Sequence, residues 1–219
     1  MNLFDILGPV MVGPSSSHTA GAVRIGYVAR HLLKDEPCEV KIGLYGSFAK
    51  TGKGHGTDRA LIAGILDMYP DDMRIAESFE LAEKAGMKFE FYTLDIRNAH
   101  PNTALIDITG KNGRKLSVQA SSLGGGRIMV NRLDGIDVNF SAEKPTLIVH
   151  NIDQPGHVAE VTSMLSHKCV NIATMQLFRD KRGGYAVMVI ETDQPIPEEA
   201  IKWLEHLEGV IKVTYVNID

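Results

Sequence analysis

Beyond Pro145 the hydrophobic pattern changes its period in a fixed order, and this order restricts the fold more than any other feature of the chain. Alternating apolar residues predict strands at 146–150, 171–178, 185–191 and 210–217, and helical spacing predicts helices at 156–167 and 197–207. The order β-α-β-β-α-β is that of a ferredoxin-like split β-α-β unit. The preceding segment 141–145 is polar and ends in proline, which favours a domain boundary there.

The residues before this boundary mix helices and strands. Helical spacing follows Thr19, strand signals dominate from residue 88 onward, and the glycine-rich segment 46–54 is predicted to be a loop, after which Thr57 or Asp58 can cap a helix. We therefore predict an α+β protein with an N-terminal α/β domain at 1–141, a linker at 142–146 and the ferredoxin-like domain at 147–219.

Composition narrows the classes of partner. The 219 residues carry a formal charge of -4 without runs of one sign, which argues against nucleic acid and anionic membrane surfaces as partners. Cys38 and Cys169 are too few for a disulfide framework or a self-contained zinc or iron-sulfur site, so no metal site is predicted within this chain. Apolar runs are broken well before membrane-spanning length, and we expect a cytoplasmic protein.

The polar run 13–19 suggests an anion-binding corner. It places Ser16, Ser17, His18 and Thr19 directly before a helical pattern, where unpaired N–H groups and the helix dipole favour a carboxylate or phosphate. An ordinary serine-rich cap is the alternative, although one side-chain oxygen is enough for capping.

Three further segments carry polar groups suited to chemistry. Segment 46–54 fails the phosphate-loop spacing by one residue, so we reject a nucleotide site, but His55, Thr57 and Asp58 follow it at a predicted helix start. The second and third segments are a turn and a glycine-rich stretch, which is either an anion-binding loop or a bulge; they contain His100, Asn102, Thr103 and Gly125.

Four motifs, GPSSSHTAGAVRIG, YGSFAKTGKGHGTD, HPNT and SSLGGGRI, occur in this order and spacing. With them the chain resembles the β subunit of the two-chain, iron-sulfur-dependent bacterial L-serine dehydratase (L-serine ammonia-lyase), and its C-terminal segment resembles an ACT domain. The resemblance implies an α subunit that ligates a 4Fe-4S cluster, activity only with that subunit, and deamination of L-serine to pyruvate and ammonia in serine catabolism and gluconeogenesis.

The resemblance also suggests roles for the candidate residues. His18 and His55 are candidates for proton transfer, because an imidazole titrates near neutral pH. Asp58 is expected to orient a histidine or to meet the ammonium group. The remaining candidates bind the substrate carboxylate or position the substrate: Ser16, Ser17, Thr19, Thr57, His100, Asn102, Thr103 and Gly125.

Catalysis is not the only reading of this resemblance. The N-terminal domain also resembles the allosteric substrate-binding domain of some phosphoglycerate dehydrogenases, so a non-catalytic, amino-acid-binding regulatory subunit stays open. In the ACT-like segment, Asn151, Asp153 and Gly156 occupy a loop where ACT domains commonly bind amino acids; pairing with a second copy is the alternative role. No lysine has a recognisable Schiff-base context, which disfavours pyridoxal phosphate chemistry.

Overall fold

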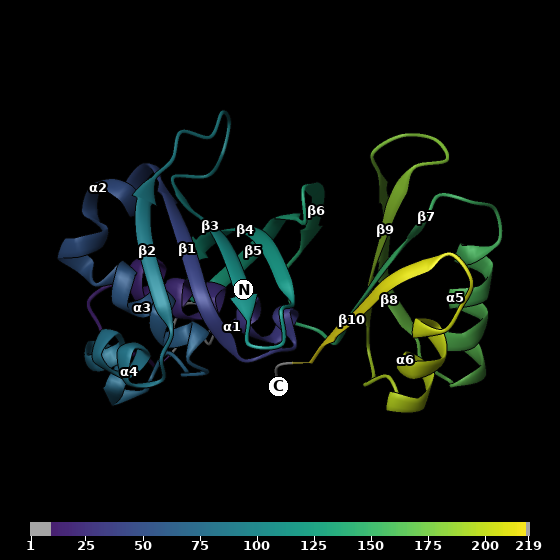
Figure 1. Cartoon of the computed structure of the whole chain (residues 1–219), viewed down its shortest axis with the longest axis horizontal. Helices are drawn as coiled ribbons and strands as arrows, with labels where there is room; N and C mark the ends of the chain where they lie inside the picture. The colour runs from purple at the N-terminus through teal and green to yellow at the C-terminus, as the bar shows by residue number, and fades with distance from the viewer. Residues whose placement is uncertain (1–9, 218–219) are drawn as a thin grey trace. The chain divides into compact units, whose positions relative to one another are not determined.

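The structure is a computed structural model that describes residues 10–217, without the side chain of Lys53. Contacts divide the chain into two compact units, one ending at Gly135 and one beginning at Ile136 (Figure 1). Each unit contains both helices and strands, so the predicted α+β class is confirmed. Within residues 10–217 no helix is long and apolar enough to cross a bilayer.

The first unit is built around a mixed sheet. Strands β1 and β2 pair in parallel, whereas β1, β3, β4 and β5 follow one another as antiparallel neighbours, so the strands of this unit lie in the order β2-β1-β3-β4-β5. Its elements are η2 (Ser16–Ala20), α1 (Gly21–Leu33), β1 (Pro37–Tyr45), α2 (Gly46–His55), α3 (Thr57–Ile65), η3 (Met73–Glu77), α4 (Ser78–Lys84), β2 (Lys88–Thr93), β3 (Asn102–Gly110), β4 (Lys115–Gly124) and β5 (Arg127–Leu133), and β6 (Ile136–Phe140) follows them.

Helix α1 packs on strands β3 to β5, and α3 lies beside it. Two glycines allow this close approach. A Cβ at Gly26 would overlap the carbonyl oxygen of Leu61, and a Cβ at Gly64 would overlap that of Val23. The two helix backbones therefore meet where neither helix carries a side chain, and this contact fixes the start of α1 relative to the start of α3.

The glycine-rich segment 46–54 was predicted to be a loop, and this was wrong. It forms most of helix α2, since Phe48 is fully buried and the N–H groups of Ser47 and Phe48 both donate to the carbonyl oxygen of Pro101. Gly56 ends the helix with a left-handed φ of 68°. Gly56 also occupies the N-cap of α3 without a side-chain hydrogen bond, so the predicted capping by Thr57 or Asp58 was wrong as well.

The second unit confirms the predicted β-α-β-β-α-β order. Strands β7 (Thr146–Ile152), β8 (Ile172–Arg179), β9 (Tyr185–Thr192) and β10 (Val210–Val216) form an antiparallel sheet of order β10-β7-β9-β8. Helices α5 (His157–His167) and α6 (Glu198–Glu205) lie on the same side of this sheet (Figure 1). Their apolar faces and the inner face of the sheet enclose a core of aliphatic residues and methionines.

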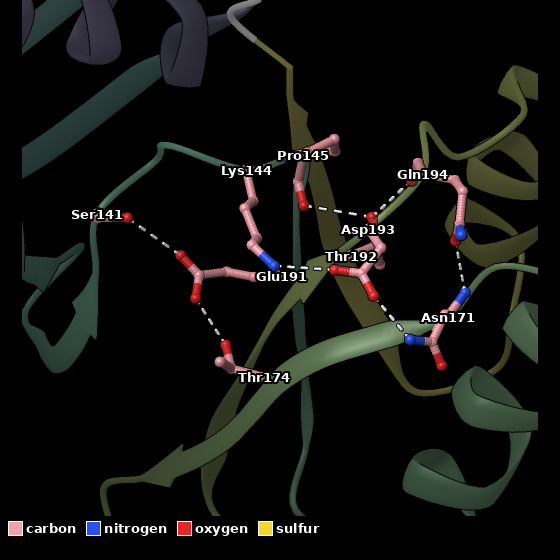
Figure 2. A network of polar contacts seen from close by, with 9 residues as sticks. All are labelled: Ser141, Lys144, Pro145, Asn171, Thr174, Glu191, Thr192, Asp193 and Gln194. Atoms are coloured by element: carbon pink, nitrogen blue, oxygen red, sulfur yellow. Dashed lines mark hydrogen bonds and ion pairs between the residues drawn. The ribbon is translucent and has the colours of Figure 1, made fainter. Parts of the chain in front are cut away.

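The segment predicted to be a linker is tied to the second unit (Figure 2). Lys144 Nζ lies 2.8 Å from Asp193 Oδ1, and the carbonyl oxygen of Pro145 accepts a hydrogen bond from Thr192 N. Glu191 joins the hydroxyls of Ser141 and Thr174. Residues 141–145 are therefore held by the end of β9.

Candidate functional site

The polar run that precedes α1 forms a short helix of its own. Segment η2 is a π-helical turn, and Ser15 caps it by accepting a hydrogen bond from His18 N at 3.2 Å through Oγ. The carbonyl oxygen of Ser15 accepts a further bond from Thr19 N. One serine thus does the capping, which leaves Ser16, Ser17 and the imidazole of His18 for other contacts.

The imidazole of His18 is surrounded by hydroxyl groups. Its Nδ1 lies 3.1 Å from Ser17 Oγ, and its Nε2 lies 3.1 Å from both Ser47 Oγ and Thr51 Oγ1. Ser47 and Thr51 are separated by one turn of α2, so both hydroxyls face the same ring nitrogen. The pairing of η2 with α2 therefore places a hydroxyl at each end of the imidazole.

One tautomer of His18 satisfies its contact with Thr51. Thr51 Oγ1 donates its single proton to the carbonyl oxygen of Ser47 at 2.9 Å. The same oxygen then acts as an acceptor toward His18, and a ring proton on Nε2 makes that contact a hydrogen bond. In the neutral ring Nδ1 is left as an acceptor, and it faces the hydroxyl of Ser17. The geometry thus presents a basic nitrogen toward Ser17.

The surroundings of His18 favour this neutral form. Burial lowers the pKa of His18 below its usual 6.5, and the neighbouring His55 lowers it further, although a hydrogen bond with the Ser47 backbone acts in the opposite direction. The rings of His18 and His55 are 5.1 Å apart, and Phe48 meets the His18 ring edge-on at 5.3 Å. His18 is therefore a neutral base at neutral pH, whereas His55 is exposed to solvent.

The turn containing His100 is joined to this site through the start of α2. The carbonyl oxygen of Pro101, between the candidates His100 and Asn102, accepts from Ser47 N at 2.7 Å. Asn102 N donates to His100 Nδ1 at 3.2 Å, and the buried hydroxyl of Thr103 donates to His100 O. The turn thus supports the helix that carries Ser47, and the His100 ring itself is exposed.

Strand β4 closes another side of η2. Gly125 N donates to Ser16 Oγ at 3.3 Å, and the three glycines at 124–126 all have positive φ values, as a tight β4–β5 connection requires. The β4–β5 register shifts between Ser122 and Gly124, so the stretch contains the bulge considered from the sequence. It also supplies an N–H to Ser16, so the two sequence interpretations are compatible.

Three buried hydroxyls near these elements have no hydrogen-bond partner among the described residues: those of Thr19, Thr57 and Ser122. They lie on η2, α3 and β4, and the latter two elements both contact η2. A buried hydroxyl without a partner costs about 1–3 kcal/mol. Such groups are suited to receive a polar ligand or bound water.

Of the two roles expected for Asp58, a contact with a histidine is absent from the described residues, and a contact with the ammonium group stays a prediction. Asp58 Oδ1 accepts from Arg59 N at 2.9 Å, and its side chain lines a cavity of about 300 Å3 that Phe48 and Lys50 also line. In the part of the chain that the structure describes, no hydrogen bond or ion pair joins Asp58 to His18 or His55. Phe48 contacts His18 and also borders the Asp58 cavity.

Ser47 and Thr51 were not among the residues selected from the sequence. Both lie in the segment taken for a loop, where a spacing of four residues has no meaning. The signal was present in GSFAKT, whose two hydroxyls share one face once the segment is helical.

In the candidate effector loop of the second unit, the Asp153 carboxylate is paired within the chain, whereas Asn151 Oδ1 is buried without a partner among the described residues. Asp153 Oδ2 accepts from Arg179 Nη1 at 3.0 Å and from Gly183 N at 2.9 Å, and these bonds lower the pKa of its carboxyl group, Gly183 having the larger effect. Asn151 is buried and donates to the carbonyl oxygen of Ile152. Gly156 has a φ of 111° directly before α5.

Neither thiol belongs to the His18 site. Cys38 lies on β1, where its Sγ donates to the carbonyl oxygen of Thr109, and Cys169 is an exposed residue after α5. Over residues 10–217 no group of three or more His, Cys, Asp or Glu side chains is arranged to hold a metal ion. Two thiols on separate units do not form a ligand set for an iron-sulfur cluster.

The α+β fold with its C-terminal β-α-β-β-α-β unit defines the class of protein, and comparison with known proteins defines the family. The family model described as serine dehydratase beta chain matches residues 2–132, and that of the ACT domain matches residues 145–208. The chain therefore belongs to the serine dehydratase beta chain family and carries an ACT domain.

Relatives agree over almost the whole length. A probable L-serine dehydratase, beta chain, of Bacillus subtilis (strain 168) is 43% identical over 215 residues, which is 98% of this chain and 97% of that protein. An L-serine dehydratase, beta chain, of Peptoniphilus asaccharolyticus is 39% identical over 98% of this chain and 97% of its own. A D-3-phosphoglycerate dehydrogenase of Archaeoglobus fulgidus is 23% identical over 98% of this chain but only 39% of its own length.

Proposed function

We propose that this chain is the β subunit of an L-serine dehydratase that converts L-serine to pyruvate and ammonia together with an α subunit. The observation that carries the proposal is the His18 imidazole, held neutral and placed between the hydroxyls of Ser17, Ser47 and Thr51. The full-length relatives named as L-serine dehydratase beta chains support the same reaction.

In this proposal the chain moves a proton and binds the substrate. The reaction removes the α-proton and the β-hydroxyl of serine, and the resulting aminoacrylate tautomerises to an imine that water hydrolyses to pyruvate and ammonia. His18 Nδ1 is the acceptor for a proton that arrives through Ser17, because Nε2 is already protonated. The exposed His55 exchanges that proton with solvent.

The substrate carboxylate is assigned to η2. The hydroxyl of Ser16 accepts from Gly125 N, that of Ser17 lies beside His18 Nδ1, and the start of a helix favours negative charge. The unpaired hydroxyls of Thr19 and Thr57 are assigned to substrate or to bound water. Asn102 and His100 border the site from the turn that supports α2.

A 4Fe-4S cluster is assigned to the α subunit. The donor set of this chain supports that division, because its two thiols lie on separate units and outside the His18 site. When bound, the cluster supplies a Lewis acid that makes the β-hydroxyl a better leaving group. The reaction is then a step of serine catabolism, which feeds gluconeogenesis in the cytoplasm.

The first test measures pyruvate formation from L-serine by this chain alone, by the α subunit alone and by the two purified together without oxygen. We expect turnover only in the iron-containing complex. Full turnover by the α subunit alone, or a stable complex without turnover, would contradict the proposal.

A second candidate function is that of a regulatory, amino-acid-binding subunit. The D-3-phosphoglycerate dehydrogenase relatives favour it. They match this chain over only part of their own length, so in those proteins the matching part is one portion of a larger enzyme. Serine binding by this chain without any change of turnover in His18 variants would support it. The ACT domain is assigned self-association, with an amino-acid effector as the alternative role.

A further inference from the structure

Three polar side chains, one on each of the neighbouring strands β3, β4 and β5, contact one another in a row. Thr103 is fully buried, Ser121 is 3% exposed and Asn131 is half-buried. Thr103 Oγ1 lies 2.8 Å from Ser121 Oγ, and Ser121 Oγ lies 2.6 Å from Asn131 Oδ1. The line ends at His100, whose carbonyl oxygen accepts from Thr103 Oγ1 at 2.6 Å.

These contacts require more protons than the two hydroxyls possess. Thr103 uses its single proton for His100 O, so Ser121 must be the donor toward Thr103. Ser121 then has no proton left for an oxygen of Asn131, and two acceptors would face each other at 2.6 Å. The side-chain amide of asparagine has nearly the same shape when its oxygen and nitrogen exchange places. A donor at this position makes every contact a hydrogen bond.

We propose that the amide nitrogen of Asn131 donates to Ser121, that Ser121 donates to Thr103, and that this one-way chain of hydrogen bonds makes Asn131 a positioning residue for the His18 site. Each of the two hydroxyls, those of Ser121 and Thr103, then donates once and accepts once. Cooperative chains of this kind hold their ends more firmly than isolated hydrogen bonds.

The His100 end of this series of hydrogen bonds connects to the His18 site through the backbone. His100 O is fixed by Thr103, and the next carbonyl oxygen, that of Pro101, accepts from the first N–H groups of α2. That helix carries Ser47, which contacts His18 Nε2. Asn131 therefore acts on the imidazole through the turn and the helix, without touching it.

The orientation of Asn131 can be measured directly on this chain in solution. With ¹⁵N-labelled asparagine, the proposal expects nuclear Overhauser contacts between the Asn131 side-chain NH₂ protons and the β protons of Ser121. An NH₂ group without these contacts, with the oxygen facing Ser121, would overturn it. This measurement does not depend on serine turnover, so it can fail or succeed independently of the proposed function.

Asn131→Asp tests the consequence for the site. An aspartate offers only acceptors, so Ser121 must turn its proton away from Thr103 and the chain breaks. We expect the amides of Ser47 and Phe48 to exchange with solvent about tenfold faster, since one hydrogen bond of support is lost. Gln119→Glu is the matched control, because it makes the same chemical change two residues before Ser121 on β4.

If Asn131→Asp does not fold, Thr103→Val and Thr103→Ser make the same test from the other end of the chain. The serine keeps the hydroxyl and is expected to keep slow exchange at Ser47, whereas the valine is not. The positioning role rests on the proposed function, so in the assembled enzyme Gln119→Glu should retain kcat while Asn131→Asp lowers it. Equal exchange rates and equal kcat in Asn131→Asp and Gln119→Glu would overturn the proposal.

Discussion

The two units treat their polar groups differently. At the candidate site of the first unit, the hydroxyls of Thr19, Thr57 and Ser122 are buried without partners, and His18 retains a basic nitrogen. At the loop of the second unit, the carboxylate of Asp153 is already held by Arg179 and Gly183, and only Asn151 Oδ1 is buried there without a partner among the described residues. Several unpartnered hydroxyls beside a neutral imidazole suit a ligand, whereas the paired carboxylate stabilises its own loop. Five predictions test this difference.

The largest effect is expected at His18. His18→Ala should lower kcat of the assembled enzyme by about 10²–10⁴-fold, the usual contribution of a positioned proton-transfer group. Pyruvate formation measures this. His206→Ala removes an exposed imidazole at the end of α6 and serves as the control. Unchanged turnover in His18→Ala would remove this residue from the catalytic assignment.

The next effect compares two buried threonines whose hydroxyls lack partners, Thr57 in the first unit and Thr214 in the second. Valine has the same shape without the hydroxyl, so both substitutions should raise the free energy of unfolding by about 1 kcal/mol. Only Thr57→Val should lower kcat/KM for serine, by about tenfold, because one hydrogen bond to substrate or bound water is lost. Denaturant unfolding and steady-state kinetics measure the two quantities. Equal activity of both variants would show that Thr57 is structural.

The third effect concerns the titration of His18. His55→Gln removes a neighbour that lowers the pKa of His18, so that pKa should rise toward 6.5. Ring resonances of this chain followed through a pH titration measure the change. A pKa that stayed in place would mean that burial alone accounts for its depression.

The same depressed pKa predicts how stability depends on pH. The folded chain holds His18 neutral while the unfolded chain protonates it near 6.5, so the contribution of His18 is intact above that pH and is lost as the pH falls through the folded pKa. When His18 is replaced, the free energy of unfolding should therefore fall less steeply as the pH is lowered below 6.5.

The smallest effect is expected at Asp153. Asp153→Asn keeps an acceptor but loses the charge that pairs with Arg179, an exposed ion pair of small energetic value. We expect a slight fall in Tm and faster proteolysis of the β8–β9 turn, with serine turnover unchanged. A large change in the serine dependence of activity would instead make the loop an effector site and remove the contrast between the units.

Much of the fold could be predicted from local pattern. The strand at Lys88–Thr93, the hairpin at Gly110–Gly113 and the order of elements after Pro145 follow from periods of 2 and 3.6 residues and from turn residues. Segment 46–54 could not be predicted in this way. Its glycines indicate a loop, but burial of Phe48 and the carbonyl oxygen of Pro101 make it a helix.

The candidate site was also only partly predictable from the sequence. His18, the serines beside it and His55 could be selected as candidates from residue type and from the likeness of four motifs to one family, and their roles stay predictions. Ser47 and Thr51 were missed because their common face exists only in the helix. Asp58 was expected to orient a histidine or to meet the ammonium group because it stands beside His55 in the sequence, whereas its side chain lines a cavity with Phe48 and Lys50.

The sequence by itself determined the kinds of groups available and the order of the elements, because both depend on neighbours along the chain. Only the tertiary structure decided which groups meet. His18 and Ser47 are 29 residues apart, and their contact depends on a glycine-rich helix held by a turn near residue 101. Hydrogen bonds between such distant groups depend on packing, and packing also sets the pKa and the tautomer of the imidazole.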